Sequence, residues 1–512
     1  MRPIKRQAFA FLTALLLVAC GGSQSGSTAG TGPTRGELLG SPARLSTITA
    51  SSVLVELNAL TDTQVLTLGG TLRCDVAVYH IEYTTVGGAN EATTASGALM
   101  VPVGLDSSCL GSRPIMLYAH GATTNRAFNI ADLTVQKNAE GFFMAFFAAQ
   151  GYIVVAPNYV GYDSSTLSYH PYLVADQQSK DMIDAVTAAR SALPTAAAPL
   201  TTDSGRLFIM GYSQGGHVAM ATHRAMQAAG MAVTASAPMS GPYALAAFTD
   251  AVFYGRVNGG APVSSVLLIT AYQASYGNIY ASTTDLFEAQ YANGIQSLLP
   301  STMTRSQLYA QGKLPMSAIF STTPPDPTFA DITPATTPVN LAPVFALGFG
   351  AGNLIKNSYR LTYLLDAEEN PDGGWPTTTT GIAAAAPGVP LRQALQRNDL
   401  RDWIPTAPIL LCGGDSDPVV FWLNTQLMQG YWASHAPPSM RLSVLDLDST
   451  ASAADPYAGL KQDFAQAKEL VAATAVAQGA TDGGAAAVAE AYHGTLVPPF
   501  CLAAVQSFFA AQ

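Results

Sequence analysis

The feature that most constrains this chain is the sequence Gly-Tyr-Ser-Gln-Gly-Gly at residues 211–216. The apolar run at 206–210 predicts a short buried strand before it, and the pattern at 217–229 predicts a helix after it. A strand, a Gly-x-Ser-x-Gly turn and a helix together can expose a serine hydroxyl on a sharp turn. The glycines flanking the serine suit such a turn because they have no Cβ that would collide where strand and helix approach. We therefore predict that Ser213 is a nucleophile and that the backbone N–H of Gln214 faces an oxyanion formed over it.

The rest of the chain alternates between predicted strands and helices. Residues 75–83 alternate polar and apolar side chains, as a half-exposed antiparallel strand does, and residues 95–103 follow as a second strand. Later apolar runs without alternation suit a parallel sheet covered on both faces. We expect an α/β fold with a mostly parallel, doubly wound sheet and right-handed crossovers. The runs lie at residues 114–119, 152–156, 207–210, 232–237, 408–414 and 441–445.

A nucleophilic serine needs a base to take its proton and a carboxylate to orient that base. In folds with this turn, the chain order is serine, acid, histidine. Asp417 follows the strand predicted at 408–414, and His493 follows the last strand, so these two residues are the expected acid and base. Two alternatives stay open. Asp415 is a rival acid, although we expect the strand still to run there, and His435 is a rival base near the end of the next helix.

Six motifs follow one another along the chain: Tyr-Ala-His-Gly at 118–121, Ala-Pro-Asn-Tyr-Val-Gly-Tyr at 156–162, His-Pro-Tyr-Leu at 170–173, the turn at 211–216, Asp-Pro-Val-Val at 417–420 and His-Gly at 493–494. Together they resemble the secretory lipase family of the lipase-A type, whose members are α/β-hydrolases. The resemblance spans about residues 70–510. It implies hydrolysis of carboxylic esters, commonly triacylglycerols and simple acyl esters. It also implies a second oxyanion donor in the His-Gly turn, for which we take the N–H of Ala122, with Thr123 as the alternative; His120 itself is expected to be structural. Asn158 departs from the aspartate that is frequent in Pro-x-Tyr-x-Gly turns, here residues 157–161.

The strand–helix rhythm stops between residues 243 and 406. This stretch contains helical patterns and Pro-rich segments, and the family places a cap before the acid strand. Long insertions of this kind lie at loop positions and often carry substrate selection. We expect a helical cap over the active site, inserted between two parts of the core at 45–242 and 407–512.

The N-terminus predicts export. Residues 1–6 are basic and residues 8–19 are apolar, a stretch shorter than the ~20 residues of a transmembrane helix. Residues 17–20, Leu-Val-Ala-Cys, resemble a bacterial lipoprotein cleavage site. The resemblance implies a signal peptide at 1–19 and a lipid on Cys20, with outer-membrane or cell-surface localisation; ordinary secretion is the alternative. Residues 20–44 are rich in Gly, Ser and Thr and are expected to form a flexible tether.

Four cysteines remain after Cys20, and an even number in an exported chain permits two disulfides. Four cysteines allow three pairings. We favour one bond between Cys74 and Cys109 and another between Cys412 and Cys501.

Composition excludes other classes of function. The net charge of −10 and the absence of Lys and Arg clusters beyond residue 6 argue against a nucleic-acid partner. No metal-ligand spacing and no phosphate-loop lysine is present, so we expect no metal and no cofactor. A serine esterase or lipase acting on a small-molecule or lipid ester is the first expectation. A serine peptidase on the same fold is the second, and a non-catalytic binding lipoprotein is the third.

Overall fold

The computed structural model describes residues 34–60, 68–134, 138–196, 200–372, 382–452 and 454–512. The expected signal peptide at 1–19, Cys20 and the tether up to residue 33 lie outside these residues. No helix in the described part of the chain is long and apolar enough to cross a membrane.

The core is a nine-stranded sheet in the order β1-β2-β3-β5-β4-β6-β7-β8-β9. The first three strands and the β3–β5 pair are antiparallel, and every neighbouring pair from β5 to β9 is parallel. The sheet is therefore mostly parallel, as the unbroken apolar runs predict. The strands are β1 (Ala43–Ile48), β2 (Asp75–Val86), β3 (Ala92–Val103), β4 (Gly111–Ala119), β5 (Ile153–Pro157), β6 (Thr201–Tyr212), β7 (Ala235–Met239), β8 (Ile409–Gly413) and β9 (Leu442–Asp446).

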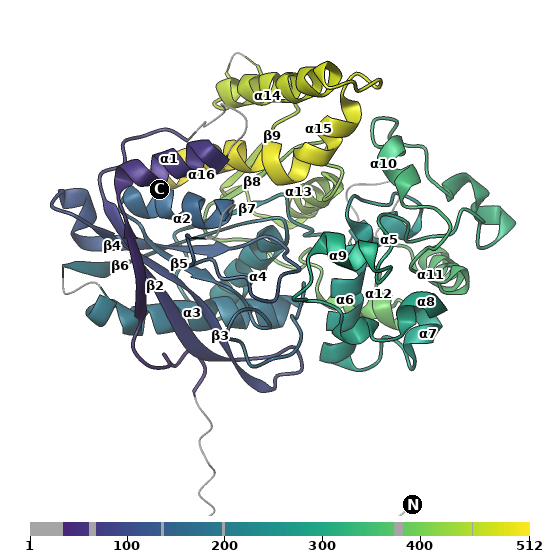
Figure 1. Cartoon of the computed structure of the whole chain (residues 1–512), viewed down its shortest axis with the longest axis horizontal. Coiled ribbons are helices and arrows are strands. Elements are labelled where there is room, and N and C mark those ends of the chain that lie inside the picture. Colours follow the sequence, from purple (N-terminus) through teal and green to yellow (C-terminus); the bar gives the residue numbers. More distant parts are fainter. Residues whose placement is uncertain (1–33, 61–67, 135–137, 197–199, 373–381, 453) are drawn as a thin grey trace, which may run out of the picture. The chain divides into compact units, whose positions relative to one another are not determined.

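Helices cover both faces of this sheet (Figure 1). Alternate strand residues point to opposite faces: Val154 packs in the cluster that holds α2, and Val155 packs in the cluster that holds α3. One face carries α1 (Ala50–Leu60), α2 (Ala139–Ala149) and α16 (Val497–Ala510). The other face carries α3 (Ala175–Ala196), α4 (Gln214–Ala228) and α13 (Leu423–His435).

The segment between β7 and β8 is helical and has its own apolar core. Across 240–372 and 382–408 the structure contains no strand of the sheet, and Figure 1 shows these helices grouped beside the sheet in teal and green. Its first and last α-helices are joined by a buried ion pair between Arg392 and Asp250, 2.8 Å long. The α-helices are α5 (Leu245–Phe253), α6 (Ala261–Tyr276), α7 (Thr283–Leu286), α8 (Ala289–Ala292), α9 (Arg305–Ala310), α10 (Ala342–Leu347), α11 (Asn357–Glu369) and α12 (Pro390–Arg397).

The N-terminal part of the core begins earlier than residue 45. The N–H of Gly36 donates to the carbonyl of Thr84, and the N–H of Leu39 donates to that of Glu82, so residues 36–39 run along β2. β1 starts at Ala43 and pairs with β2. The expected tether is therefore too long at its C-terminal end. Composition does not predict that residues 36–39 and β1 are ordered, because backbone hydrogen bonds hold them and these bonds depend little on the side chain.

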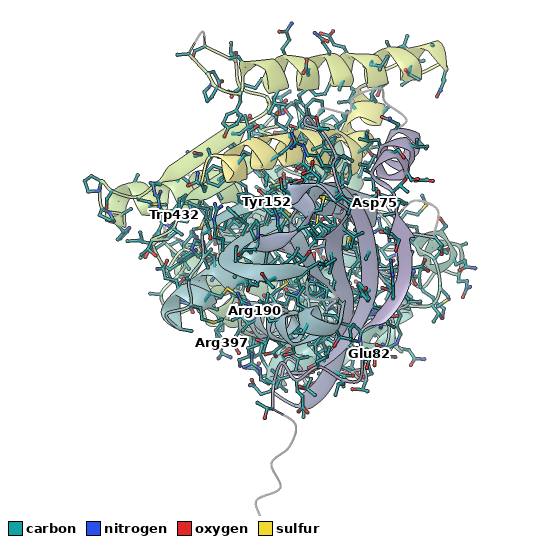
Figure 2. All side chains as sticks on the ribbon, turned by 90° about the vertical axis from the view of Figure 1, so that its left-hand side faces the viewer. Asp75, Glu82, Tyr152, Arg190, Arg397 and Trp432 are labelled. Atoms are coloured by element: carbon teal, nitrogen blue, oxygen red, sulfur yellow. A yellow bond between two sulfur atoms is a disulfide. The ribbon has the colours of Figure 1, made fainter. Side chains whose placement is uncertain are left out.

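The C-terminal part adds helices outside the sheet after β9. These are α14 (Ala458–Ala477) and α15 (Ala485–Ala491), followed by one π-helical turn (Tyr492–Leu496) that leads into α16. Figure 2, with Asp75 and Glu82 of β2 labelled, shows α14 lying beyond α16 from the sheet. Disulfides join Cys74 to Cys109 and Cys412 to Cys501, the favoured pairing. The second bond fixes α16 to β8, and disulfides are typical of proteins outside the reducing cytosol.

Candidate active site

Ser213 lies on a sharp turn between β6 and α4. Its φ of 59° and ψ of −121° are rare for a residue with a side chain, and such strain is typical of a serine exposed at a strand-to-helix turn. A Cβ on Gly215 would lie 1.9 Å from the carbonyl oxygen of Ala119, and one on Gly211 would lie 2.2 Å from the carbonyl oxygen of Gly215. Both glycines are therefore required by close backbone packing. The helix begins at Gln214, three residues earlier than the sequence pattern predicts.

The structure brings Ser213, His493 and Asp417 together by hydrogen bonds. His493 Nε2 lies 2.8 Å from Ser213 Oγ, and His493 Nδ1 lies 2.7 Å from Asp417 Oδ2. Asp417 is 1% exposed and His493 is 9% exposed, whereas Ser213 is partly open to solvent. An imidazole held in this way can take a proton from the serine while the carboxylate orients it.

Asp417 is fixed by its own turn. Its Oδ1 accepts hydrogen bonds from the N–H groups of Val419 at 2.9 Å and Val420 at 3.0 Å, which leaves Oδ2 for His493. The rival Asp415 is also beyond the strand, because β8 ends at Gly413. The expectation that the strand runs through Asp415 is therefore wrong. Asp415 is exposed, whereas the buried Asp417 is the carboxylate bonded to His493.

His493 follows the last strand, as expected, and lies in the π-helical turn before α16. A π turn adds a residue to the helix and commonly marks functional positions. The ring of Tyr212 packs against that of His493 at 5.0 Å between centroids, and the Tyr212 O–H donates to the His493 carbonyl. The rival His435 is the last residue of α13 and is exposed, with Nδ1 bonded to the carbonyl of Tyr431.

The His-Gly turn lies beside the serine. A Cβ on Gly121 would be 3.9 Å from the Cβ of Ser213 and 3.7 Å from the carbonyl oxygen of Tyr212. The N–H groups of Ala122 and Gln214 have no hydrogen-bond acceptor among the described residues, so both are available to an oxyanion. His120 has a structural place: its ring nitrogens contact two backbone carbonyls, and burial lowers its pKa to about 4.

Asn158 is buried and uses both ends of its amide. Its Oδ1 accepts from the N–H of Ile130 at 2.8 Å, and its Nδ2 donates to Ser96 Oγ at 2.9 Å. An aspartate could accept the first bond but could not donate the second. The departure from the family's turn is therefore matched by a donor–acceptor pair in this chain.

Three polar residues near the site were not identified from the sequence. Glu140 accepts from the N–H of Gly121 at 3.2 Å, and burial raises the pKa of its carboxyl group to about 7. Asp448 and Tyr492 form a hydrogen-bonded pair next to Asp417 and His493. The one available signal was position, since Tyr492 immediately precedes His493 and Asp448 closely follows the last strand.

Within the residues that the structure describes, no group of three or more His, Cys, Asp or Glu side chains could hold a metal ion. The titratable groups that meet here form the Ser213–His493–Asp417 arrangement instead.

Comparisons with known proteins agree with this fold. Residues 140–268, which include the serine turn, match the prolyl oligopeptidase family, a match that covers less than half of the chain. No curated protein matches the sequence. The structure of a protein from Legionella pneumophila is similar with a TM-score of 0.59 and 18% identity, covering 80% of this chain and 92% of that one. The sheet topology and these similarities show that the chain has the α/β-hydrolase fold.

Greater similarity is found with structures of LipA from Xanthomonas oryzae, described as a rice cell wall degrading esterase. One LipA structure is 27% identical with a TM-score of 0.62, covering 84% of this chain and 95% of LipA. A ligand-bound form is 24% identical with a TM-score of 0.65, covering 93% and 98%. The likeness therefore extends over nearly the whole of LipA.

Proposed function

We propose that this chain is a serine esterase or lipase that hydrolyses carboxylic esters through an acyl-enzyme. The observation that carries the proposal is the continuous hydrogen-bonded chain from Ser213 Oγ through His493 to Asp417. Ser213 attacks the ester carbonyl carbon while His493 Nε2 takes its proton, and His493 then gives that proton to the departing alcohol. Water attacks the acyl-enzyme by the same route in reverse and releases the carboxylic acid.

In this proposal, the N–H groups of Ala122 and Gln214 bind the oxyanion that forms when Ser213 attacks. The two groups approach it from opposite elements, the turn after β4 and the start of α4. Losing one such donor typically costs ~10²–10³-fold in rate. The partial burial of the site strengthens these contacts because less water competes for them.

A serine peptidase on the same fold is the second candidate. The match to the prolyl oligopeptidase family favours it, but that match ends at residue 268, within the insertion and before Asp417 and His493. The likeness to LipA covers 84% of this chain, a much larger share, and favours the esterase. Purified protein should hydrolyse a short-chain nitrophenyl ester and leave an aminoacyl anilide intact. Cleavage of the anilide with no action on the ester would favour the peptidase.

We further propose that the insertion at 243–406 is a cap that selects the acyl chain. It reaches the turns on both sides of Ser213. The N–H of Ser301 donates to the carbonyl of Thr124 at 2.7 Å, beside the oxyanion turn, and the N–H of Gly259 donates to that of Pro418 at 2.8 Å, beside the acid. Each CH₂ buried under an apolar cap adds up to ~0.8 kcal/mol of binding. Shortening the insertion should change the profile of kcat/KM across esters from acetate to palmitate. An unchanged profile in a folded variant would make the insertion a structural addition.

Lipid attachment at Cys20 and outer-membrane or cell-surface localisation remain a proposal from the sequence. The disulfides agree with an extracytoplasmic environment. Stable anchoring takes more than one acyl chain, which a mature lipoprotein would supply. Cys20→Ser should move the protein from the membrane fraction to the soluble fraction of expressing cells. Equal solubility of the two forms would indicate ordinary secretion.

A further inference from the structure

Asp448 connects the segment that carries the acid to the segment that carries the base. It lies two residues beyond the end of β9, and its side chain is 11% exposed. Its carboxylate accepts three hydrogen bonds from three different parts of the chain. The donors are the N–H of Ser416 at 2.8 Å, the O–H of Tyr492 and the ammonium group of Lys468.

Two of these donors are direct sequence neighbours of the acid and the base. Ser416 immediately precedes the acid Asp417, and Tyr492 immediately precedes the base His493. Both donate to the same oxygen, Oδ2 of Asp448. Oδ2 of Asp448 therefore binds both the backbone N–H of Ser416, next to the acid, and the side chain of Tyr492, next to the base.

Close packing around Tyr492 restricts the movement of its contact with Asp448. A Cβ on Gly414 would lie 2.0 Å from the Tyr492 hydroxyl oxygen, so the acid turn lies directly against the tyrosine. The Tyr492 ring is 1% exposed and packs on Phe464 of α14, with 5.6 Å between ring centroids. The Lys468 ammonium group lies 4.8 Å from the centroid of the same Phe464 ring.

The charge of Asp448 is stabilised in this position. Burial alone would raise the pKa of its carboxyl group, but hydrogen bonds from Lys468, Tyr492 and Ser416 outweigh burial and lower the pKa below its ordinary value. A second carboxylate supports the same turn, since Asp446 Oδ1 accepts from the N–H groups of Asp415 at 3.1 Å and of Asp448 at 3.0 Å. Helix α14 contributes both Lys468, which binds Asp448, and Phe464, which packs on Tyr492. The helix therefore supports the acid and base segments.

We propose that Asp448 is a positioning residue that sets the distance between Asp417 and His493. The inference rests on the proposed function of Ser213, Asp417 and His493. Asp448 touches none of the reacting atoms and acts through Ser416 and Tyr492. A misplacement of about 1 Å in a catalytic group can cost ~10²-fold in rate, so loss of this contact should lower the chemical step rather than substrate binding.

Asp448→Asn tests the proposal because it keeps the shape and removes the charge. Asp455→Asn is the matched control: Asp455 also pairs with a lysine of α14, Lys461, and accepts a backbone N–H, but its side-chain hydrogen bonds are to Tyr457 and Lys461, not to the acid turn or the base segment. The measurements are kcat and KM for a nitrophenyl ester, the second-order rate constant for fluorophosphonate labelling of Ser213, and the melting temperature.

We expect Asp448→Asn to lower kcat and the labelling rate constant by about 10- to 100-fold, with KM changed by less than about twofold. Asp455→Asn should match the wild type in all three. A lowered melting temperature with kcat and labelling unchanged would overturn the proposal and leave Asp448 a purely structural residue. If Asp448→Asn does not fold, Tyr492→Phe provides the test, because it removes only the hydroxyl oxygen that binds Asp448. This variant should still lower kcat several-fold. Unchanged kcat would overturn the proposal. A wild-type protein that does not label at all would contradict the proposed function itself, which is a distinguishable result.

Discussion

The serine and its two partners are held by different physical means. On the serine side, β4, β6 and α4 approach so closely that glycine is required, and backbone packing fixes Ser213. On the acid–base side, Asp417 and His493 belong to segments that follow different strands, and polar side chains such as Asp446, Asp448 and Tyr492 hold them together. Sterically fixed positions tolerate no added volume, whereas hydrogen-bonded positions should lose function in proportion to the bonds removed.

The largest effect should come from the base. His493→Ala should lower kcat/KM for a nitrophenyl ester by several orders of magnitude, since removal of a triad member removes proton transfer. His435→Ala is the matched control, because His435 is exposed and lies at the end of α13. Steady-state kinetics of both variants provide the check. An active His493→Ala variant together with an inactive His435→Ala variant would show that His435, and not His493, is the base.

Gly215→Ala should break the serine side by volume alone. The added Cβ would lie 1.9 Å from the carbonyl oxygen of Ala119, so the turn must shift. We expect about 10²-fold or greater loss of kcat/KM and destabilisation by roughly 1–3 kcal/mol. Gly459→Ala is the control, because no atom lies within 4 Å of the position of its Cβ. Denaturant unfolding and kinetics measure both effects, and wild-type behaviour of Gly215→Ala would show that the close approach is not needed.

The two sides of the site also differ in how well the sequence predicts them. The serine turn, the strands from β2 to β9 and the disulfide pairing could be predicted because each depends on a local pattern or on a small set of alternatives. The missed features depend on contacts between distant segments. β1 and residues 36–39 are held by backbone bonds to β2, and the π turn at His493 has no local signature. Asp448 and Tyr492 are 44 residues apart, so no spacing rule connects them.

The smallest effect concerns pH and a buried histidine of α4, on the serine side. Burial lowers the pKa of His217 to about 4, while in the unfolded chain the pKa keeps its ordinary value of 6.5. The folded state therefore excludes a proton that the unfolded state binds between these values. Stability from His217 is fully present above pH 6.5 and is lost as pH falls towards 4, by ~1.4 kcal/mol per pH unit.

Urea unfolding at pH 7 and pH 5 of the wild type and His217→Gln provides the measurement. The wild type should lose more stability than the variant on acidification. His435→Gln, at an exposed position, should lose as much as the wild type. Equal losses in the wild type and His217→Gln would mean that His217 is accessible to protons in the folded protein.

The central claim is that Ser213 is the activated nucleophile of this site, and covalent labelling tests it most directly. Wild-type protein and Ser213→Ala are treated with a fluorophosphonate probe, and the modified peptide is identified by mass spectrometry. The account predicts one adduct per chain, on the peptide that contains Ser213, and none on Ser213→Ala. Labelling of Ser213→Ala, or a wild-type adduct on another residue, would contradict it.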